Sequence, residues 1–194
     1  MIVLEGFDQA GKKTQSKLLA EALRAKKKKC KTFNFPDYST PFGKEIKRYL
    51  NGKRKFSPQV IHCLLAANRW EKLGEIKDAI SKNYVLIMNR YYQSNLVYGT
   101  VTGLDRRWLA NLDAGLPKAD LVIVLDIPAK DSFNRKRNRR DRFEKNKEHA
   151  RKIVRTYKKL TKEFGWKKVD ASGTKREVHE SIMKLVSKKL QLKK

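Results

Sequence analysis

Residues 6–14 of the chain read Gly6-Phe7-Asp8-Gln9-Ala10-Gly11-Lys12-Lys13-Thr14. A short apolar run, Ile2–Leu4, comes before this stretch, and a segment with apolar residues at helical spacing comes after it. The order is therefore strand, glycine-containing loop and helix, which is the context that a phosphate-binding loop requires.

The residue types in this loop suit a nucleoside triphosphate. Gly6 and Gly11 allow backbone N–H groups to turn inward around a phosphate, and the N-terminus of the next helix adds partial positive charge. Lys12 can reach the β- and γ-phosphates. The following position usually carries a hydroxyl for Mg²⁺, but here it is Lys13, and the hydroxyl comes one residue later at Thr14. The alternative interpretation is a glycine-containing turn before a surface helix.

The composition predicts one domain, residues 1–194, with a strong basic charge. Apolar residues make up 40% of the 194 positions, which is enough for a buried core. The 47 Lys and Arg residues outnumber the 20 Asp and Glu residues, which gives a formal net charge of +27. This charge favours anionic partners: nucleotides, nucleic acid or an anionic membrane. A solvated basic face explains runs such as Lys26–Lys29 equally well.

The two cysteines, Cys30 and Cys63, show no spacing typical of zinc, and a reducing cytosol is the simpler expectation. Neither a signal peptide nor a run of 18 apolar residues is recognisable, so we expect a cytoplasmic protein without a membrane partner.

Strand-like runs alternate with helical segments along the rest of the chain. Further strands are predicted at Lys31–Phe35, Tyr84–Met88, Leu121–Leu125 and Trp166–Val169. Helices are predicted near 43–50, 57–81, 93–101, 105–114, 129–138 and 145–164, and from about residue 175. This order predicts an α/β fold: a doubly wound parallel sheet of about five strands flanked by helices, with ligands at the carboxyl ends of the strands.

Two further segments carry residues suited to a small-molecule site. Arg90 follows the third predicted strand and can bind a phosphate, or form a surface salt bridge instead. Ser94 or Asn95 would share a helix face with Tyr98, which by itself could equally be a packed aromatic. Within the helix predicted at 57–81, Arg69 falls one turn after Leu65, so a donor and an apolar contact could line one pocket. Taken alone, Arg69 is typical of a surface arginine.

The densest basic stretch is Arg135-Lys136-Arg137-Asn138-Arg139-Arg140-Asp141-Arg142. Between Phe133 and Phe143 there is no large apolar residue, so an arginine-rich lid over about 134–144 is expected to be mobile. Its arginines could close over a triphosphate and neutralise charge, or they could grip a nucleic-acid backbone.

Taken together, these segments resemble the thymidylate kinase family of the nucleoside monophosphate kinases. The resemblance spans nearly the whole chain, and its segments are Leu4–Lys12, Phe35–Thr40, Ala67–Glu71, Asn89–Tyr91, Gly115–Leu121, Asp141–Glu144 and Val169–Ser172. It implies the reaction ATP + dTMP → ADP + dTDP with Mg²⁺, in a homodimer formed by helix packing.

The resemblance also implies roles for single residues. On the acceptor side, Asp8 would accept a hydrogen bond from the 3′-hydroxyl, and Arg90 with Tyr38 would hold the phosphate. Phe35 would close the pocket, and Leu65 and Ser94 would form part of its wall. Arg69 would donate to O4 of thymine, and Asn95 would contact N3. Tyr98 would restrict the space at the 2′ position of the sugar. ATP would be bound by Gln9, Ala10, Gly11, Lys12, Lys13, Thr14, Arg135 and Ala171. Catalysis would rest on Lys12, Arg90, Arg137, Arg139 and Arg140.

Four positions depart from the family pattern. Gln9 stands where some relatives carry a catalytic arginine, so the lid arginines are expected to replace it. Lys13 replaces a hydroxyl residue, and Asn89 replaces an aspartate that supports Mg²⁺ through water, so a weak metal contact is expected at Asn89. Leu65 replaces an aromatic that stacks on thymine. These departures leave open a broader deoxynucleoside monophosphate kinase, or a basic nucleic-acid-binding paralogue with weak or no kinase activity.

Overall fold

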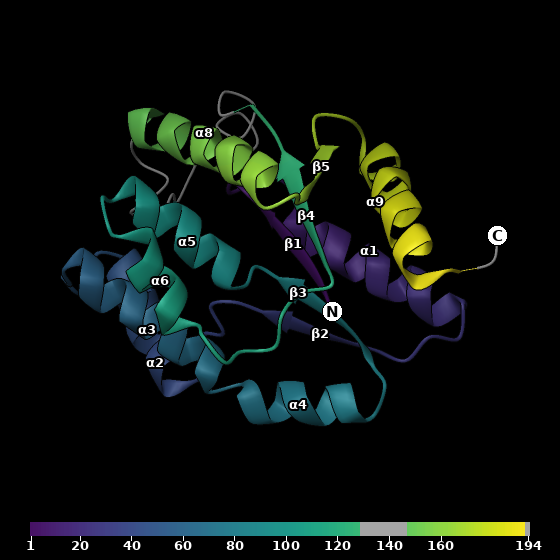
Figure 1. Ribbon diagram of the computed structural model, residues 1–194, viewed down its shortest axis with the longest axis horizontal. Coiled ribbons are helices and arrows are strands. Elements are labelled where there is room, and N and C mark those ends of the chain that lie inside the picture. The colour runs from purple at the N-terminus through teal and green to yellow at the C-terminus, as the bar shows by residue number, and fades with distance from the viewer. Residues whose placement is uncertain (129–146, 193–194) are drawn as a thin grey trace.

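A computed structural model describes residues 1–128 and 147–192 of the chain. Its centre is a parallel sheet with strand order β2-β3-β1-β4-β5 (Figure 1). The strands are β1 (Ile2–Gly6), β2 (Cys30–Asn34), β3 (Val85–Asn89), β4 (Leu121–Asp126) and β5 (Lys167–Asp170). The predicted α/β class and five-stranded parallel sheet are therefore confirmed, with strand bounds shifted by one or two residues.

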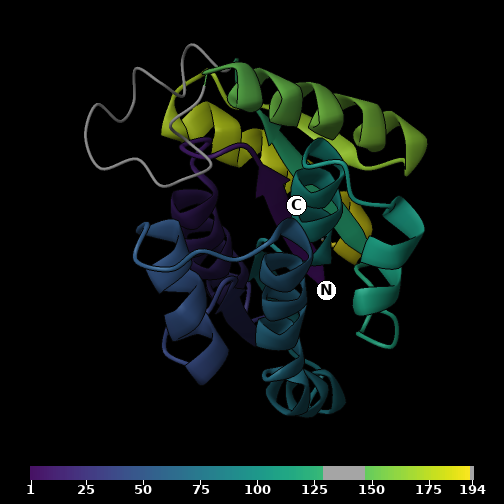
Figure 2. The ribbon, with the colours of Figure 1, turned by 90° about the vertical axis from the view of Figure 1, so that its left-hand side faces the viewer.

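Helices cover both faces of this sheet (Figure 1). Their bounds are α1 (Lys12–Ala25), α2 (Pro41–Leu50), α3 (Pro58–Trp70), α4 (Leu73–Ser81), α5 (Tyr92–Val101), α6 (Arg106–Leu112), α8 (Lys147–Glu163) and α9 (Lys175–Leu190). Figure 2 turns the molecule so that α3, α5 and α8 face the reader. The helix predicted near 129–138 lies outside the described residues.

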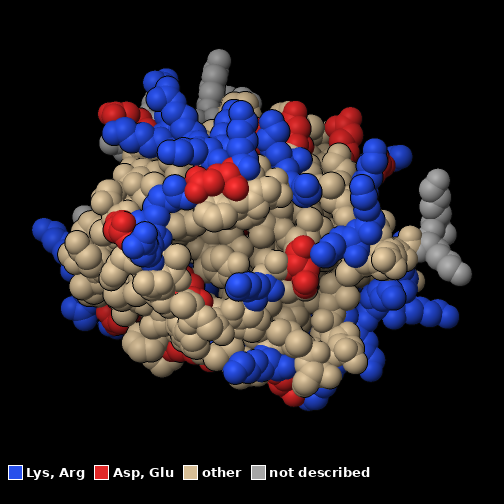
Figure 3. Space-filling view, viewed as in Figure 1, with Lys and Arg blue, Asp and Glu red and all other residues tan. Residues whose placement is uncertain are grey.

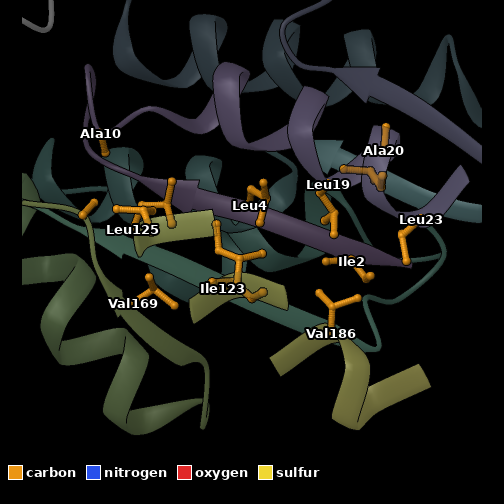
Figure 4. Packing of buried hydrophobic residues seen from close by; sticks show 14 of the residues in the cluster. Ile2, Leu4, Ala10, Leu19, Ala20, Leu23, Ile123, Leu125, Val169 and Val186 are labelled. Carbon is orange, nitrogen blue, oxygen red and sulfur yellow. The ribbon is translucent and has the colours of Figure 1, made fainter. Parts of the chain in front are cut away.

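Strand β1 shows why two layers of helix are needed, because its successive side chains point to opposite faces. Ile2 and Leu4 are buried with residues of α1 and α9, as Figure 4 shows for Leu19, Leu23 and Val186. On the other face, Val3 is buried with residues of α4. Such a strand, apolar on both faces, is stable only in the centre of a covered parallel sheet.

The helix predicted over residues 57–81 is in fact two helices. Its start is as predicted, with Ser57 as N-cap and Pro58 in the first turn. It is interrupted at Lys72, whose φ of −96° and ψ of 1° leave the helical range. The end of α3 is held against α6, because Trp70 Nε1 donates to Leu112 O at 2.9 Å. Each of the two helices buries its own row of apolar side chains, so the apolar periodicity continues across the break. The sequence pattern therefore could not reveal that the helix is interrupted.

Tight packing at the carboxyl end of β1 fixes the start of the phosphate-binding loop. Gly6 has a φ of 134°, and a Cβ at this position would lie 2.5 Å from Leu125 O. Gly11, with a φ of 89°, is the N-cap of α1. Both positions therefore need glycine, the first for space and conformation and the second for conformation alone.

Candidate active site

A large cleft of about 1070 Å³ opens at the carboxyl end of the sheet. The six loop residues assigned to ATP, together with Ala171, line it: Gln9, Ala10, Gly11, Lys12, Lys13 and Thr14. The Lys12 ammonium lies inside the loop and donates to Gly6 O at 3.0 Å and Phe7 O at 2.8 Å. No described side chain caps the N-terminus of α1, so its first backbone N–H groups can serve an anionic ligand.

A small pocket of about 110 Å³ lies beside the large cleft. Its lining includes every residue predicted to bind the second substrate: Asp8, Phe35, Tyr38, Leu65, Arg69, Arg90, Ser94, Asn95 and Tyr98. Pro36, Leu50 and Tyr91 also line it, although the sequence interpretation assigned them no contact with the substrate. The cleft and the pocket share Asp8, Phe35, Pro36, Tyr38 and Arg90, so the two spaces meet where a phosphoryl group could pass between them.

Arg90 stands at this junction in a sparsely populated backbone conformation, with a φ of 65°. Its guanidinium forms an ion pair with Asp8 and donates to Ser94 Oγ at 2.9 Å. It also donates to the hydroxyls of Tyr98 and Tyr157, each at 3.3 Å. These contacts hold the guanidinium in one orientation, which excludes the simple surface salt bridge considered from the sequence.

The Asp8 carboxyl is ionised at neutral pH. Burial alone would raise its pKa, but the positive charges of Arg90 and Lys12 and hydrogen bonds from Arg90 and Tyr98 outweigh burial and lower the pKa. Tyr98 Oη donates to Asp8 Oδ2 at 3.1 Å. Asp8 is therefore a charged acceptor that can also take a hydrogen bond from a hydroxyl in the pocket.

Glu5, on β1, is fully buried behind Arg90 and was not recognised from the sequence. Its carboxylate accepts hydrogen bonds from Tyr91 N at 2.9 Å, Ser94 N at 3.1 Å, Ser94 Oγ at 2.7 Å and Tyr157 Oη at 2.9 Å. An acidic residue in an otherwise apolar strand was the only available signal. The carboxylate joins β1 to α5 and α8, and so fixes Ser94 and Tyr157, whose hydroxyls accept hydrogen bonds from Arg90.

Arg69 is buried, contrary to the expectation for an isolated arginine in a surface helix. Its Nε and Nη2 donate to the two carboxylate oxygens of Asp113 at 2.7 and 2.8 Å. This bidentate pairing uses two of its three nitrogens, so Nη1 stays available to a ligand in the small pocket. Asp113 lies 44 positions from Arg69, and no local pattern indicated it.

Asn68 fixes the segment after β2, which forms one wall of both spaces. The amide accepts from Asp37 N at 2.8 Å and donates to Asp37 O at 3.1 Å and Thr40 Oγ1 at 2.7 Å. Gly43 of α2 packs so closely there that a Cβ would lie 1.7 Å from Asp37 O. Asn68 therefore holds the wall that carries Phe35 and Tyr38 against α3.

Asn89 ends β3 and lines the large cleft. Its Nδ2 donates to Asn34 Oδ1 at 3.0 Å, while its buried Oδ1 has no partner among the described residues. The same described residues contain no group of three or more His, Cys, Asp and Glu able to hold a metal ion. Asn89 thus fits a neutral acceptor for metal-bound water but not a direct anionic ligand.

Arg135, Arg137, Arg139 and Arg140, and the lid predicted over about 134–144, lie outside the described residues. On the face that Figure 3 shows, many of the Lys and Arg side chains gather along the top, over α8 and β5. Among the described side chains of α8, the exposed basic residues are Arg151, Lys152, Arg155, Lys158, Lys159 and Lys162. No described helix combines the length and apolar character needed to cross a membrane.

The fold is a doubly wound sheet with a phosphate-binding loop, and a second pocket lined by Arg69 and Arg90 adjoins that loop. This combination is typical of the P-loop kinases that act on nucleoside monophosphates. The sequence model of the thymidylate kinase family matches residues 4–182, and the chain belongs to that family. It is therefore an ATP-dependent nucleoside monophosphate kinase, and the resemblance seen in the sequence is confirmed.

Relatives match the chain over almost its whole length. The thymidylate kinase of Schizosaccharomyces pombe is 38% identical over 192 residues, covering 96% of this chain and 91% of the relative. That of Homo sapiens is 37% identical over 185 residues, covering 94% and 87%. Among solved structures, the thymidylate kinase of Candida albicans, described as having broad substrate specificity, superposes with a TM-score of 0.86 at 29% identity. This match covers 96% of the chain and 90% of that structure.

Proposed function

We propose that this protein transfers the γ-phosphoryl group of ATP to dTMP, giving ADP and dTDP. The observation that carries the proposal is the junction of the large cleft and the small pocket at Asp8 and Arg90. ATP in the cleft would place its γ-phosphate at this junction, and the phosphate of dTMP in the pocket would meet it there. Catalysis then consists of positioning and charge stabilisation, without a covalent intermediate.

In the small pocket, the Arg90 guanidinium binds the acceptor phosphate, with Tyr38 beside it. Asp8 accepts a hydrogen bond from the 3′-hydroxyl, and Tyr98, which donates to Asp8, restricts the space at the 2′ position. The base lies between Phe35 and Leu65, with Arg69 at O4 and Asn95 at N3. Both Phe35 and Leu65 line the pocket, which supports this placement.

On the donor side, the loop N–H groups and Lys12 bind the phosphates of ATP, and Ala171 lies against the adenine. Because Gln9 carries no charge, we assign the stabilisation of the moving phosphoryl group to Arg137, Arg139 and Arg140, on sequence grounds alone, with Arg135 over the adenine. Replacing the three together with Ala is expected to lower kcat at least about tenfold with little change in dTMP binding. Unchanged turnover with weaker DNA binding would instead identify a nucleic-acid contact.

Mg²⁺ is the expected metal, bound mainly through the ATP phosphates. When bound, it neutralises charge on the phosphates. From this chain, Asn89 Oδ1 is the acceptor that suits one of its waters, because it is buried and without a described partner. Lys13 adds positive charge at the same cleft, which further weakens the hold on a cation.

We also propose a homodimer formed by helix packing. Helix α3 leaves the apolar residue Val60 44% exposed and Cys63 exposed one turn further along. We assign this face of α3 to the contact with the second subunit. Light scattering of the purified protein is expected to give twice the chain mass, and Val60→Glu to give the monomer mass. A monomeric wild-type protein would contradict the proposal.

The assignment is tested by measuring ADP release with dTMP, dUMP, dGMP, dCMP, dAMP and UMP. The highest kcat/KM is expected for dTMP. Leu65 offers an aliphatic wall without aromatic stacking, and this favours a broader deoxynucleotide kinase as the second candidate. Comparable kcat/KM values for dTMP and dGMP would support that candidate, and the absence of turnover with all six would contradict kinase function.

A further inference from the structure

We propose that His62 is a positioning residue that sets the orientation of the Asn95 amide and so makes the small pocket select thymine over cytosine. The inference rests on the proposed function, since it concerns the base of the acceptor nucleotide. His62 lies on α3 and is fully buried. It is not among the residues that line the small pocket, whereas Asn95 is. The imidazole therefore acts from behind the residue that faces the base.

The contacts of Asn95 leave one orientation for its amide. Asn95 Nδ2 lies 3.3 Å from His62 O and 3.5 Å from Asp113 Oδ2. Both of these oxygens are acceptors, so the amide group facing them must be the donor. Asn95 Oδ1 is consequently directed at His62 Nδ1, with which it forms a short hydrogen bond. A flipped amide would bring Oδ1 against a carbonyl and a carboxylate.

The same contacts determine the tautomer of His62. Burial lowers the pKa of His62, and the charge of Arg69 lowers it further, against the hydrogen bond to Asn95 and the charge of Asp113, so the ring is neutral at pH 7. A neutral imidazole has one N–H, and it must be at Nδ1 because Asn95 Oδ1 can only accept. Nε2, which then carries a lone pair, is buried without a hydrogen-bond partner among the described residues.

This arrangement presents an acceptor to the base. The amide oxygen of Asn95 has two lone pairs, and His62 uses one of them. The other can receive the N3–H of thymine, while Arg69, held by Asp113, donates to O4. Cytosine carries an unprotonated N3 and an amino group at these two positions. Its N3, an acceptor, would face the Asn95 oxygen, which is also an acceptor, and its amino group, a donor, would face the donor Arg69. Selection therefore depends on the amide not rotating by 180°.

The test compares the ratio of kcat/KM for dTMP to that for dCMP in three variants. His62→Leu removes the N–H donor at similar volume and leaves the Asn95 amide held only by the backbone oxygen of residue 62 and by Asp113, at 3.3 and 3.5 Å in the wild type. The ratio is expected to fall on the order of fivefold, the loss of about one hydrogen bond, because the amide can then turn its NH2 group toward N3 of cytosine. His62→Asn retains an N–H donor near the Nδ1 position and is expected to preserve most of the ratio. Ile61→Val, on the same helix, controls for general loosening of α3 and should leave the ratio unchanged.

A ratio in His62→Leu equal to that of the wild type would overturn the role of His62, even if both kcat/KM values fell. A wild-type protein that prefers dCMP to dTMP would instead contradict the proposed function. Nitrogen NMR of ¹⁵N-histidine-labelled wild-type protein provides a test that needs no variant to fold. A buried imidazole protonated at Nδ1 and not at Nε2 is expected, and the opposite tautomer would overturn the inference.

Discussion

The large cleft and the small pocket differ in the groups that line them. The cleft, about 1070 Å³ in volume, is lined by the backbone of a loop and by exposed side chains such as Lys13. The pocket, about 110 Å³, is walled by side chains that other side chains hold, as in Arg69–Asp113 and Arg90–Asp8. Backbone N–H groups and charge suit a triphosphate, which all nucleoside triphosphates share. Fixed side chains suit a base and a sugar, so we expect substrate selectivity to come from the small pocket.

The largest expected effect comes from breaking the buried pair in the pocket. Asp113→Ala leaves the Arg69 guanidinium buried without its counter-ion and should destabilise the fold by about 3–5 kcal/mol. The control is Asp105→Ala on the same helix, whose exposed side chain caps the helix by accepting from Trp108 N at 2.7 Å. Loss of this cap should cost about 1 kcal/mol. Urea unfolding measures both, and equal losses would show that Arg69 does not depend on Asp113.

In the cleft, Lys12→Ala should lower kcat by roughly two orders of magnitude or more while the free energy of unfolding changes little. The ammonium is a preorganised charge, and no described side chain replaces it in the loop. Lys13→Ala, one residue along but exposed, is the matched control and should change kcat by only a few-fold. The measurement is kcat for ADP release by both variants and by the wild type. Wild-type-like turnover in Lys12→Ala would refute the phosphate-loop assignment.

A smaller effect is expected at Asn89, which lines the cleft near the junction with the pocket. Asn89→Asp replaces a neutral acceptor with an anion and should lower the Mg²⁺ concentration for half-maximal rate by a few-fold. The measurement is a Mg²⁺ titration of the initial rate at saturating ATP and dTMP. Equal midpoints would remove position 89 from metal support. Loss of activity would show that the new carboxylate captures Arg90, and that asparagine serves to leave this arginine available.

The smallest effect concerns the pH dependence of stability at His62. The folded-state pKa lies below the ordinary value of 6.5, so the unfolded chain takes up a proton first as the pH falls. The contribution of His62 is therefore complete above about pH 6.5 and is lost as the pH falls toward the folded-state pKa. His62→Leu should show a shallower loss of stability between about pH 7 and pH 5. His149 and His179, whose pKa values burial also lowers, contribute equally in both proteins. Parallel pH profiles would show that His62 is not buried neutral.

Local residue spacing predicted the phosphate-binding loop directly, whereas the residues of the pocket were assigned through the family resemblance. The loop is one continuous stretch, and strand, glycine and lysine follow one another with fixed spacing. The pocket depends on contacts between distant segments: 33 positions separate His62 from Asn95, and 44 separate Arg69 from Asp113. Spacing along one element carries no information about such partners. The residues assigned to the base therefore came from the resemblance, whereas the residues that hold them required coordinates.

The hydrogen bond from Tyr157 to Glu5 affects the order in which the site can assemble during synthesis. These residues are separated by 152 positions, so the carboxylate is synthesised long before the hydroxyl that donates to it. Until α8 (Lys147–Glu163) has left the ribosome, Glu5 lacks one donor and Arg90 lacks one neighbour. Contacts of such long range are closed late in folding, because loop closure precedes any gain from the contact. A nascent chain in which Tyr157 has not yet been synthesised would thus contain the complete phosphate loop, but its Arg90 would lack the contact with the Tyr157 hydroxyl.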